Sequence, residues 1–269
     1  MSAPVVTLPS ATSWRGIIGS DAMVRILAGI GILLVWEIVV RLWAPPFVAR
    51  PSRIIAVFPD VIASPAFWQA AGSTLGAVFE GLAIAFVFGT AIGIAVGRIR
   101  VVDRMLQLYI SGLFATPMVA ILPLFSLWFG YTADARLATV IFAAFFSIVL
   151  NVADGARSVP PEYIEVSRAY RGGAWSRLFD VILPTSVPYI LAGLRLAAGR
   201  ALIGAVVAEY FTTIGGLGYF ILFQTRTFHH NEAFVAVAVL ALAGVLFEFA
   251  LLRATSRFLP WYRRDESGG

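Results

Sequence analysis

The 269-residue sequence contains no cysteine and no lysine, and its two histidines, His229 and His230, are adjacent. The absence of cysteine excludes disulfide bonds and metal sites built from thiolates. Two neighbouring histidines without a cluster of partner ligands do not favour a metal centre, so we interpret them as solvated loop residues. The sequence therefore predicts no metal site and no catalytic residue.

Charged residues are also scarce. They make up 13% of the chain, whereas hydrophobic residues make up 59% and the mean hydropathy is +0.87. A soluble domain is about 45–50% apolar and about 25% charged. The net charge of +5 comes entirely from arginine, but nucleic-acid binding would need a basic patch on a soluble face. Because the arginines lie between apolar runs, we predict an all-α integral membrane protein.

Six apolar runs approach the length of about 20 residues that a helix needs to cross a bilayer. The first resembles a secretory signal, but a long segment precedes it and Arg41 follows it directly, so we interpret it as an uncleaved helix. Pro117 and Pro123 interrupt the third run, and Gly89, Gly93 and Gly97 in the second predict close approach of another helix. The predicted spans are about 26–40, 74–96, 105–129, 136–152, 188–211 and 234–252.

These spans divide the chain into three parts. Residues 1–66 hold a cytoplasmic segment, the first span and an outside segment with a short helix from Ser52 to Ala63. Residues 67–257 form the main transmembrane domain, and 258–269 form a tail. Cytoplasmic loops of membrane proteins are rich in basic residues. With the N-terminus inside, thirteen arginines fall inside and five outside, so both termini are predicted to be cytoplasmic.

The inside segment of about 153–187 is the most informative part of the sequence. Pro161 suits the first turn of a helix, Glu162 and Glu165 suit its positive end, and the pair Gly172–Gly173 suits its stop. Trp175, Leu178, Phe179 and Ile182 then recur at helical spacing, which predicts a second short helix ending at Leu183–Pro184. Two short amphipathic helices joined by a tight turn can dock into a groove on another protein; the alternative is a pair resting on lipid headgroups.

At these residues the sequence resembles the permeases of binding-protein-dependent ABC importers, in the nitrate, sulfonate and taurine branch. Glu165 matches the glutamate of the family's Glu-Ala-Ala motif, with Val166 and Ser167 in place of the alanines. Leu183–Pro184 keep the family's spacing, but Arg171 occupies its glycine position. Further matching stretches are 120–124, 127–130, 192–195, 208–209 and 215–219, and the resemblance covers about Phe67 to Arg257.

The resemblance implies a type I ABC importer permease fold whose cytoplasmic loop carries coupling helices. Two copies, expected to be a homodimer, would form the pathway for a small anion, or for another small organic solute. The loop would dock on a cytoplasmic ATPase dimer, and a periplasmic solute-binding protein would deliver the solute. The chain has no phosphate loop of its own, so ATP would be bound by the partner. The residues implied in coupling are Glu162, Glu165, Val166, Ser167, Arg168, Arg171, Gly172, Gly173, Leu183 and Pro184.

Three ionisable residues, Glu80, Arg200 and Glu209, fall inside the predicted spans. Such residues are costly in lipid and face a cavity or a partner, which makes them candidates for the solute pathway. Arg200 lies about 18 Å into the fifth span at a rise of ~1.5 Å per residue. The alternative is a structural bond, for example between Arg200 and Glu80 or another span.

Two other classes of membrane protein fit less well. A secondary transporter is disfavoured because the six spans show no inverted internal repeat. A membrane enzyme is disfavoured because no acid, nucleophile or metal cluster is present. The stretch Asp154-Gly155-Ala156-Arg157 lacks the two residues between glycine and alanine that the phospholipid-forming phosphotransferase motif requires, and the further downstream aspartates of that motif are also missing.

The arginine distribution yields a test of topology. Ser158→Cys and Ser267→Cys are expected to react with impermeant thiol reagents in inside-out vesicles, and Thr227→Cys in intact spheroplasts. The absence of native cysteine makes each introduced thiol unique. Labelling of Ser158→Cys from outside would contradict the six-span arrangement.

Overall fold

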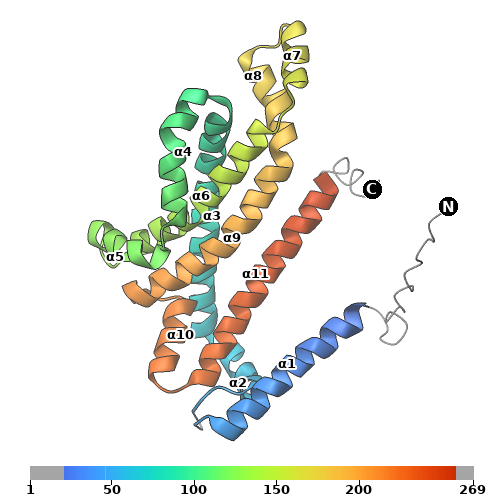
Figure 1. The fold of residues 1–269 in the computed structure, drawn as a ribbon. Helices are drawn as coiled ribbons and strands as arrows, with labels where there is room; N and C mark the ends of the chain where they lie inside the picture. The colour runs from blue at the N-terminus through green and yellow to red at the C-terminus, as the bar shows by residue number, and fades with distance from the viewer. Residues whose placement is uncertain (1–20, 46, 259–269) are drawn as a thin grey trace, which may run out of the picture.

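The computed structural model describes residues 21–45 and 47–258, and its regular structure over these residues is helical (Figure 1). Part of the predicted N-terminal segment and nearly all of the predicted tail, with Arg15, Arg263, Arg264 and Ser267, lie outside the described residues. The elements are α1 (Asp21–Trp43), α2 (Pro51–Ala63), α3 (Pro65–Arg98), α4 (Arg100–Ala115), α5 (Met118–Phe129), α6 (Ala133–Arg157), α7 (Pro161–Ala169), α8 (Ala174–Ser176), a π-helical turn (Arg177–Ile182), α9 (Leu183–Thr212), α10 (Leu217–Arg226) and α11 (His230–Phe258).

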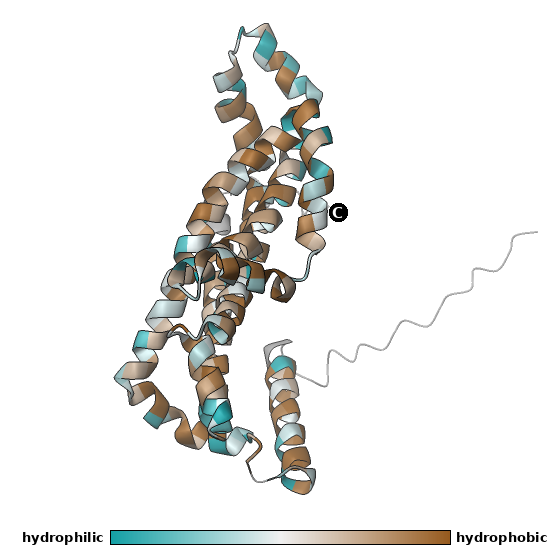
Figure 2. Ribbon diagram, turned by 90° about the vertical axis from the view of Figure 1, so that its left-hand side faces the viewer, coloured by the Kyte–Doolittle hydropathy of each residue, from teal (hydrophilic) through white to brown (hydrophobic). Residues whose placement is uncertain are grey.

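The predicted all-α membrane fold is confirmed. Within the described residues, five helices are long and apolar enough to cross a membrane, or six if the bent pair α4–α5 counts as one span. Figure 2 shows hydrophobic residues along the lengths of the long helices and hydrophilic residues gathered mainly toward the ends of the bundle. This distribution is expected when lipid surrounds the middle of the bundle and water its ends.

The third predicted span is interrupted, as its prolines indicate, but at only one of them. The helix bends by 102° between its two halves, α4 and α5, at Thr116–Pro117. Thr116 is extended, with φ −69° and ψ 130°, because a residue that precedes proline is disfavoured in the helical region. Pro123 lies inside α5 without ending it. The first proline of the run therefore breaks the helix, and the second does not.

The centre of the bundle is α6, which packs between α3 and α9. Its Val140, Ile148 and Val152 belong to an apolar core shared with both neighbours. Gly93 and Gly97 of α3 lie so close to α6 that an added Cβ would stand 2.9 Å from the Val149 carbonyl oxygen and 2.6 Å from that of Ala153. Small residues allow this approach, because transmembrane helices associate mainly by close packing. The expected close contact at the glycines of the second span is confirmed.

The bundle has two ends, which we name after α7 and α10. The α7 end carries the α3–α4 connection, the segment between α6 and α9, and the last turns of α11 (Figure 1). The α10 end carries α2, the α9–α10 turn and the α10–α11 connection. Among the residues that the structure describes, the arginines predicted to lie on the cytoplasmic side belong to segments that lead to the α7 end. Those predicted to be outside belong to the other end.

Helix α1 stands apart from the bundle along most of its length (Figure 1), and most of its side chains are exposed. It is attached near the α10 end, where Trp36 packs against Phe234 with ring centroids 5.3 Å apart. The Glu37 carboxylate also accepts hydrogen bonds from the backbone and hydroxyl of Ser52 at the start of α2, at 3.0 and 2.8 Å. The apolar surface of α1 is therefore left to lipid or to another protein.

The glycine contacts between α3 and α6 predict that glycine-to-alanine substitutions at two positions of α3 have unequal effects on stability. Gly93→Ala is expected to lower the thermal stability of the purified protein, since its Cβ would lie 2.7 Å from the Val152 Cβ and 2.9 Å from a backbone oxygen. Overpacking of this kind costs about 1–3 kcal/mol. Gly76→Ala is the matched control, because its added Cβ would have no atom within 4 Å. Equal melting midpoints in detergent would show that α3 and α6 do not depend on this contact.

Candidate functional site

The segment between α6 and α9 begins with α7, which is built as the sequence predicts. Pro161 lies in its first turn and Glu162 follows. Ile164 faces inward and packs with Ala156, Val159 and Ile182 in a small apolar cluster at the α7 end. This cluster seats α7 on the end of α6 and on the start of the following helix.

The turn after α7 explains the arginine at the family's glycine position. The Gly172 amide donates to the Ser167 carbonyl and the Arg171 amide to the Arg168 carbonyl, both at 2.8 Å. This is the Schellman arrangement, in which the residue after the C-cap takes a left-handed conformation. That residue is Arg171, with φ 54°. Arginine thus adopts the conformation that glycine would supply, at a cost of about 1–2 kcal/mol, and the turn geometry is retained.

The second predicted helix does not end at Leu183–Pro184, which corrects the prediction. A helix begins at Ala174, passes through the π-helical turn and continues without a break to Thr212, over 39 residues. A proline ring collides with the carbonyl four residues earlier in an α-helix. The wider π-helical turn immediately before Leu183–Pro184 relieves this collision, so the helix continues. The segment is therefore one short helix, one turn and the first part of a long helix.

The outward face of this segment is aromatic. The expected single apolar face divides in two: Leu178 and Ile182 pack inward, whereas Trp175 and Phe179 are exposed and stack with centroids 5.9 Å apart. Tyr163, Val166 and Tyr170 are exposed on α7. We call these exposed residues, Tyr163, Val166, Tyr170, Trp175 and Phe179, the aromatic docking face. Exposed apolar patches of this kind mark sites of protein interaction.

The predicted acidic residues lie beside this face. Glu162 and Glu165 are exposed, and within the described residues no hydrogen bond or ion pair involves the Glu165 carboxylate. Glu165 therefore does not hold the start of α7. Ser167 and Gly172 form the turn, and Arg177 donates to the Gly172 carbonyl at 3.0 Å. The residues of the set that the structure brings together at this end are Glu162, Glu165, Val166, Ser167, Arg168, Arg171, Gly172 and Gly173; Leu183 and Pro184 follow on the long helix.

Ion pairs tie this segment to α4. Arg157, the last residue of α6, pairs with Asp103 of α4 and with Asp154 of its own helix. Arg98 of α3 donates to the Ala156 carbonyl at 3.2 Å. No sequence pattern indicates the pairing of Arg157 with Asp103, because the partners are 54 residues apart. The ion pair fastens the end of α6, where the segment begins, to α4.

Glu209 lies in a buried polar network at the α10 end. Its carboxylate is fully buried and pairs with Arg136 of α6 at 3.1 Å. Thr74 of α3 and the Gly218 amide each donate to it at 2.8 Å. The network, which we call the Glu209 network, joins three long helices to the α9–α10 turn. Arg136 is one of the five arginines predicted to lie outside. It instead lies within α6 and is only 8% exposed.

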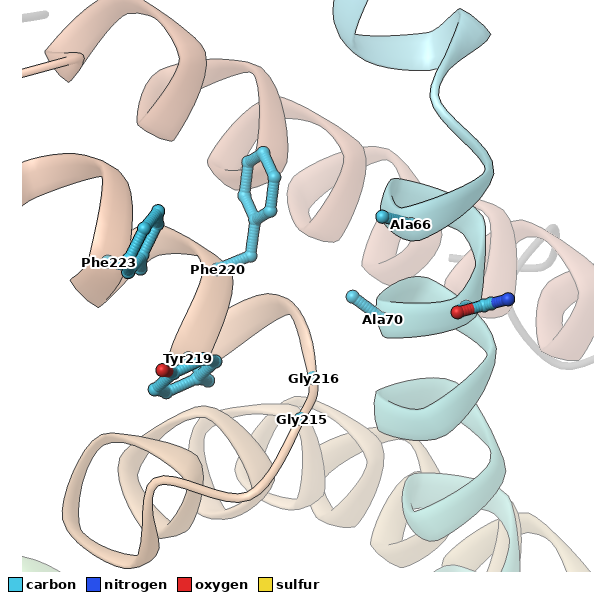
Figure 3. A pocket seen from close by; sticks show the side chains of 8 residues that line it. Ala66, Ala70, Gly215, Gly216, Tyr219, Phe220 and Phe223 are labelled. Atoms are coloured by element: carbon cyan, nitrogen blue, oxygen red, sulfur yellow. The ribbon is translucent and has the colours of Figure 1, made fainter.

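The Glu209 network also shapes the turn at 213–218. A Cβ on Gly216 would collide with the Glu209 carboxylate, and one on Gly218 would lie 2.7 Å from the Val206 carbonyl oxygen. The turn borders a pocket of about 340 Å³. Figure 3 shows Ala66 and Ala70 of α3 across this pocket from Gly215, Gly216 and the rings of α10. No charged side chain lines the pocket, and its polar side chains are Gln69 and Tyr219.

Arg200 lies at a different place from Glu209. The two are nine residues apart on α9, which is about 13.5 Å along the axis. The Arg200 guanidinium carbon stands 3.9 Å from the centroid of the Phe114 ring on α4. Arg200 is partly buried, and no carboxylate of the described residues lies within ion-pairing distance. Glu80 is exposed on α3, so the structure does not join Arg200 to Glu80.

The histidines have ordinary surroundings. His229 is 3.1 Å from the Thr227 hydroxyl, and the ring of His230 lies 5.9 Å from Phe47 and 6.1 Å from Phe228. Among the described residues, no group of three or more histidine, aspartate or glutamate side chains is arranged to hold a metal ion.

Comparison with known proteins gives consistent results. Residues 85–264 match the family model "Binding-protein-dependent transport system inner membrane component". The chain is 30% identical over 237 residues to the formylaminopyrimidine transport permease protein ThiX of Halalkalibacterium halodurans, covering 87% of this chain and 94% of that protein. It is 27% identical to the putative aliphatic sulfonates transport permease protein SsuC of Bacillus subtilis, over 86% of this chain and 84% of that protein. Permease proteins named for bicarbonate, taurine and nitrate transport are 26–29% identical.

A solved structure shows the same fold. A chain of the MetNI methionine ABC transporter in inward-facing conformations aligns with a TM-score of 0.64 at 18% identity, covering 72% of this chain and 98% of that chain. At this identity the likeness concerns the fold alone.

The Glu209 network predicts a large structural effect. Glu209→Ala is expected to prevent stable assembly or to lower the melting midpoint of the purified protein sharply, because it leaves Arg136 buried without a counter-charge. Removing one partner of a buried ion pair costs about 3–5 kcal/mol. The double variant Glu209→Leu with Arg136→Leu is expected to be more stable than Glu209→Ala, since it removes both charges. A Glu209→Ala protein that melts like the unmodified chain but fails in uptake would instead place Glu209 in the solute pathway.

Proposed function

The chain belongs to the family of binding-protein-dependent transport system inner membrane components, and from this premise we propose its role. We propose that the chain forms the pathway for a small anion and receives the ATP-driven motion through α7. The family membership makes the chain a multi-pass inner membrane protein and a transport subunit without catalytic activity or cofactor. ATP is hydrolysed by a separate ATPase, and a binding protein serves the system. The solute, the coupling residues and the arrangement of the copies are our proposal.

The aromatic docking face supports the coupling role. Five exposed apolar or aromatic side chains project from a short helix and the start of a long one, outside the apolar middle of the bundle. Glu165 stands beside them with no partner in the described residues. An ATPase groove with a basic group would bury this face and pair with Glu165. Because the helix from Ala174 continues into α9, a rotation of the docked segment would be transmitted to the middle of the bundle.

The position of the arginines supports an α7 end in the cytoplasm. Arg98, Arg100 and Arg104 lie at the α3–α4 connection, and Arg168 and Arg171 lie on or after α7. Basic residues accumulate on the cytoplasmic side of membrane proteins. Both termini would then be cytoplasmic, the ATPase would meet α7, and the binding protein would meet the α10 end.

Arg200 is the structural observation that favours an anionic solute. Its guanidinium lies on the side of α9 that faces the break between α4 and α5, where Phe114 offers a ring face but no negative charge. A second copy of the chain would enclose this side and complete a pathway. A cation–π contact is worth only about 0.5–2 kcal/mol, so the guanidinium could attract an anion without holding it too tightly to leave.

The names of the relatives support the same solute class, with one exception. Sulfonate, bicarbonate and nitrate are small anions, and taurine carries a sulfonate group. The formylaminopyrimidine permease ThiX provides the second candidate, a small organic solute without a net charge, and it is 30% identical to this chain. Uptake of labelled nitrate, bicarbonate, aliphatic sulfonates and formylaminopyrimidine by the assembled system separates the two candidates.

Charge reversal at Glu165 tests the coupling role. Glu165→Lys is expected to abolish transport and weaken ATPase binding while the protein remains inserted, since losing one partner of a desolvated charge pair costs about 2–5 kcal/mol. Glu165→Gln is expected to be intermediate. Asp60→Lys makes the same reversal on exposed α2 at the opposite end and is the control for ATPase binding. Normal ATP-dependent uptake by Glu165→Lys would refute the proposed contact.

Neutralisation of Arg200 tests the anion pathway. Arg200→Gln is expected to keep expression, assembly and basal ATP hydrolysis while uptake of the anion falls sharply. Arg25→Gln, which neutralises an exposed arginine near the start of α1, is the control for a general loss of positive charge. Failure of Arg200→Gln to assemble, or normal uptake by it, would show that this arginine is structural or incidental.

A further inference from the structure

A long apolar groove lies between α3, α9 and α11, away from the Arg200 side of α9. It has a volume of about 430 Å³, and its nine lining residues are alanine, valine, leucine and phenylalanine. Phe79 of α3, Leu202 of α9 and Phe247 of α11 form its three walls. A volume of this size is within the range of about 300–1,000 Å³ found for small-molecule pockets.

An ion pair lies at one end of this groove. Arg195 of α9 pairs with Glu248 of α11, and about half of each side chain is exposed. Arg195 lies three residues, about one turn, before the lining residue Ala198. Glu248 lies between Phe247 and Ala250, which both line the groove. Because α9 and α11 run in opposite directions, the pair is at the α7 end of the groove.

The charge at this end is positive. Glu248 lies five residues, about 7.5 Å, before Arg253, and Arg257 follows on the same helix. Three arginines of α9 and α11 therefore accompany Glu248, and Glu80 of α3 follows the lining residue Phe79. A guanidinium has five N–H donors, and the bond from Arg195 to Glu248 uses its Nη2. Its exposed donors can bind a phosphate beside the carboxylate. Charges within a span that are exposed to lipid require water, a headgroup or a partner.

We propose that the groove binds an acyl chain of an anionic phospholipid whose phosphate is held by Arg195. The apolar walls receive the chain, and the positive end complements the headgroup of the leaflet at the α7 end. The lipid would fill the groove between α3, α9 and α11, beside the contact of the Phe79 and Phe247 rings.

The chain's own α1 is a poorer occupant of the groove. It reaches α11 near the α10 end, through Trp36 and Phe234. Laid along the groove in its present direction, it would bring Arg25 near the positive α7 end of α11, where like charges repel. An anionic headgroup brings the opposite charge.

The test uses the assembled complex in vesicles of phosphatidylcholine that contain phosphatidylglycerol with a photoactivatable group on its acyl chain. Labelled peptides are expected from residues 75–79 and 243–250. Ala243→Trp fills the groove from one wall and is expected to reduce labelling about tenfold, which corresponds to ~1.4 kcal/mol. Leu242→Trp adds the same side chain at the neighbouring, 56% exposed position and is expected to leave labelling unchanged. Arg195→Gln is expected to abolish the preference for phosphatidylglycerol over equally labelled phosphatidylcholine.

Three results would overturn the proposal. Equal labelling of Ala243→Trp and Leu242→Trp would mean general contact with bilayer lipid. A lack of preference between the two headgroups in the unmodified protein would remove the role of Arg195. A rapid disulfide between cysteines placed at Ala243 and at Leu34 of α1 would show that a helix occupies the groove. If Ala243→Trp does not assemble, Ala250→Leu at the mouth of the groove gives the same comparison.

Discussion

The close approach of α6 to α3 and α9 is the contact on which the rest of the bundle depends. In lipid, apolar side chains gain little by leaving their surroundings, so helix association relies on packing and on hydrogen bonds. Here glycines at 93 and 97 bring α3 within reach of the α6 backbone, and Gly193 and Gly204 do the same for α9. Most other long helices are held less tightly: α1 and α11 are largely exposed, and α5 bends away from α4. A rigid three-helix centre with loosely attached outer helices is suited to a subunit whose parts must move.

The two ends of this centre differ in how they are fastened. At the α10 end, the Glu209 network ties α3, α6 and α9 to the following turn through buried charges and hydrogen bonds. At the α7 end, the ties are partly exposed ion pairs such as Arg157 with Asp103, which contribute little to stability. The π-helical turn lies between this end and α9. A motion that begins at α7 would therefore bend the structure near the α7 end first, while the other end resists.

The sequence was sufficient to predict those parts of the fold that depend on local chemistry. Hydropathy located the spans, and Pro161 marked the start of α7. It did not predict that Pro184 would lie within a helix, because relief by a π-helical turn depends on the packing of Leu178 and Ile182 against α6 and α7. Nor did it pair Glu209 with Arg136, since charge counting treats a basic residue at the edge of a run as a loop residue. Arg171 shows the converse: the residue departs from the family pattern, yet the left-handed backbone is kept.

Three arginines of α6 and α9, Arg136, Arg195 and Arg200, show how the protein uses charge in the membrane. Arg136 is buried against Glu209, so its charge is neutralised within the fold. Arg195 is half exposed beside Glu248, at the edge where a headgroup can reach it. Arg200 has the face of Phe114 and no carboxylate among the described residues within ion-pairing distance. A charge without a counter-charge inside a membrane is energetically costly, and such charges mark substrate pathways. A passing anion would provide the missing negative charge only while it is being transported.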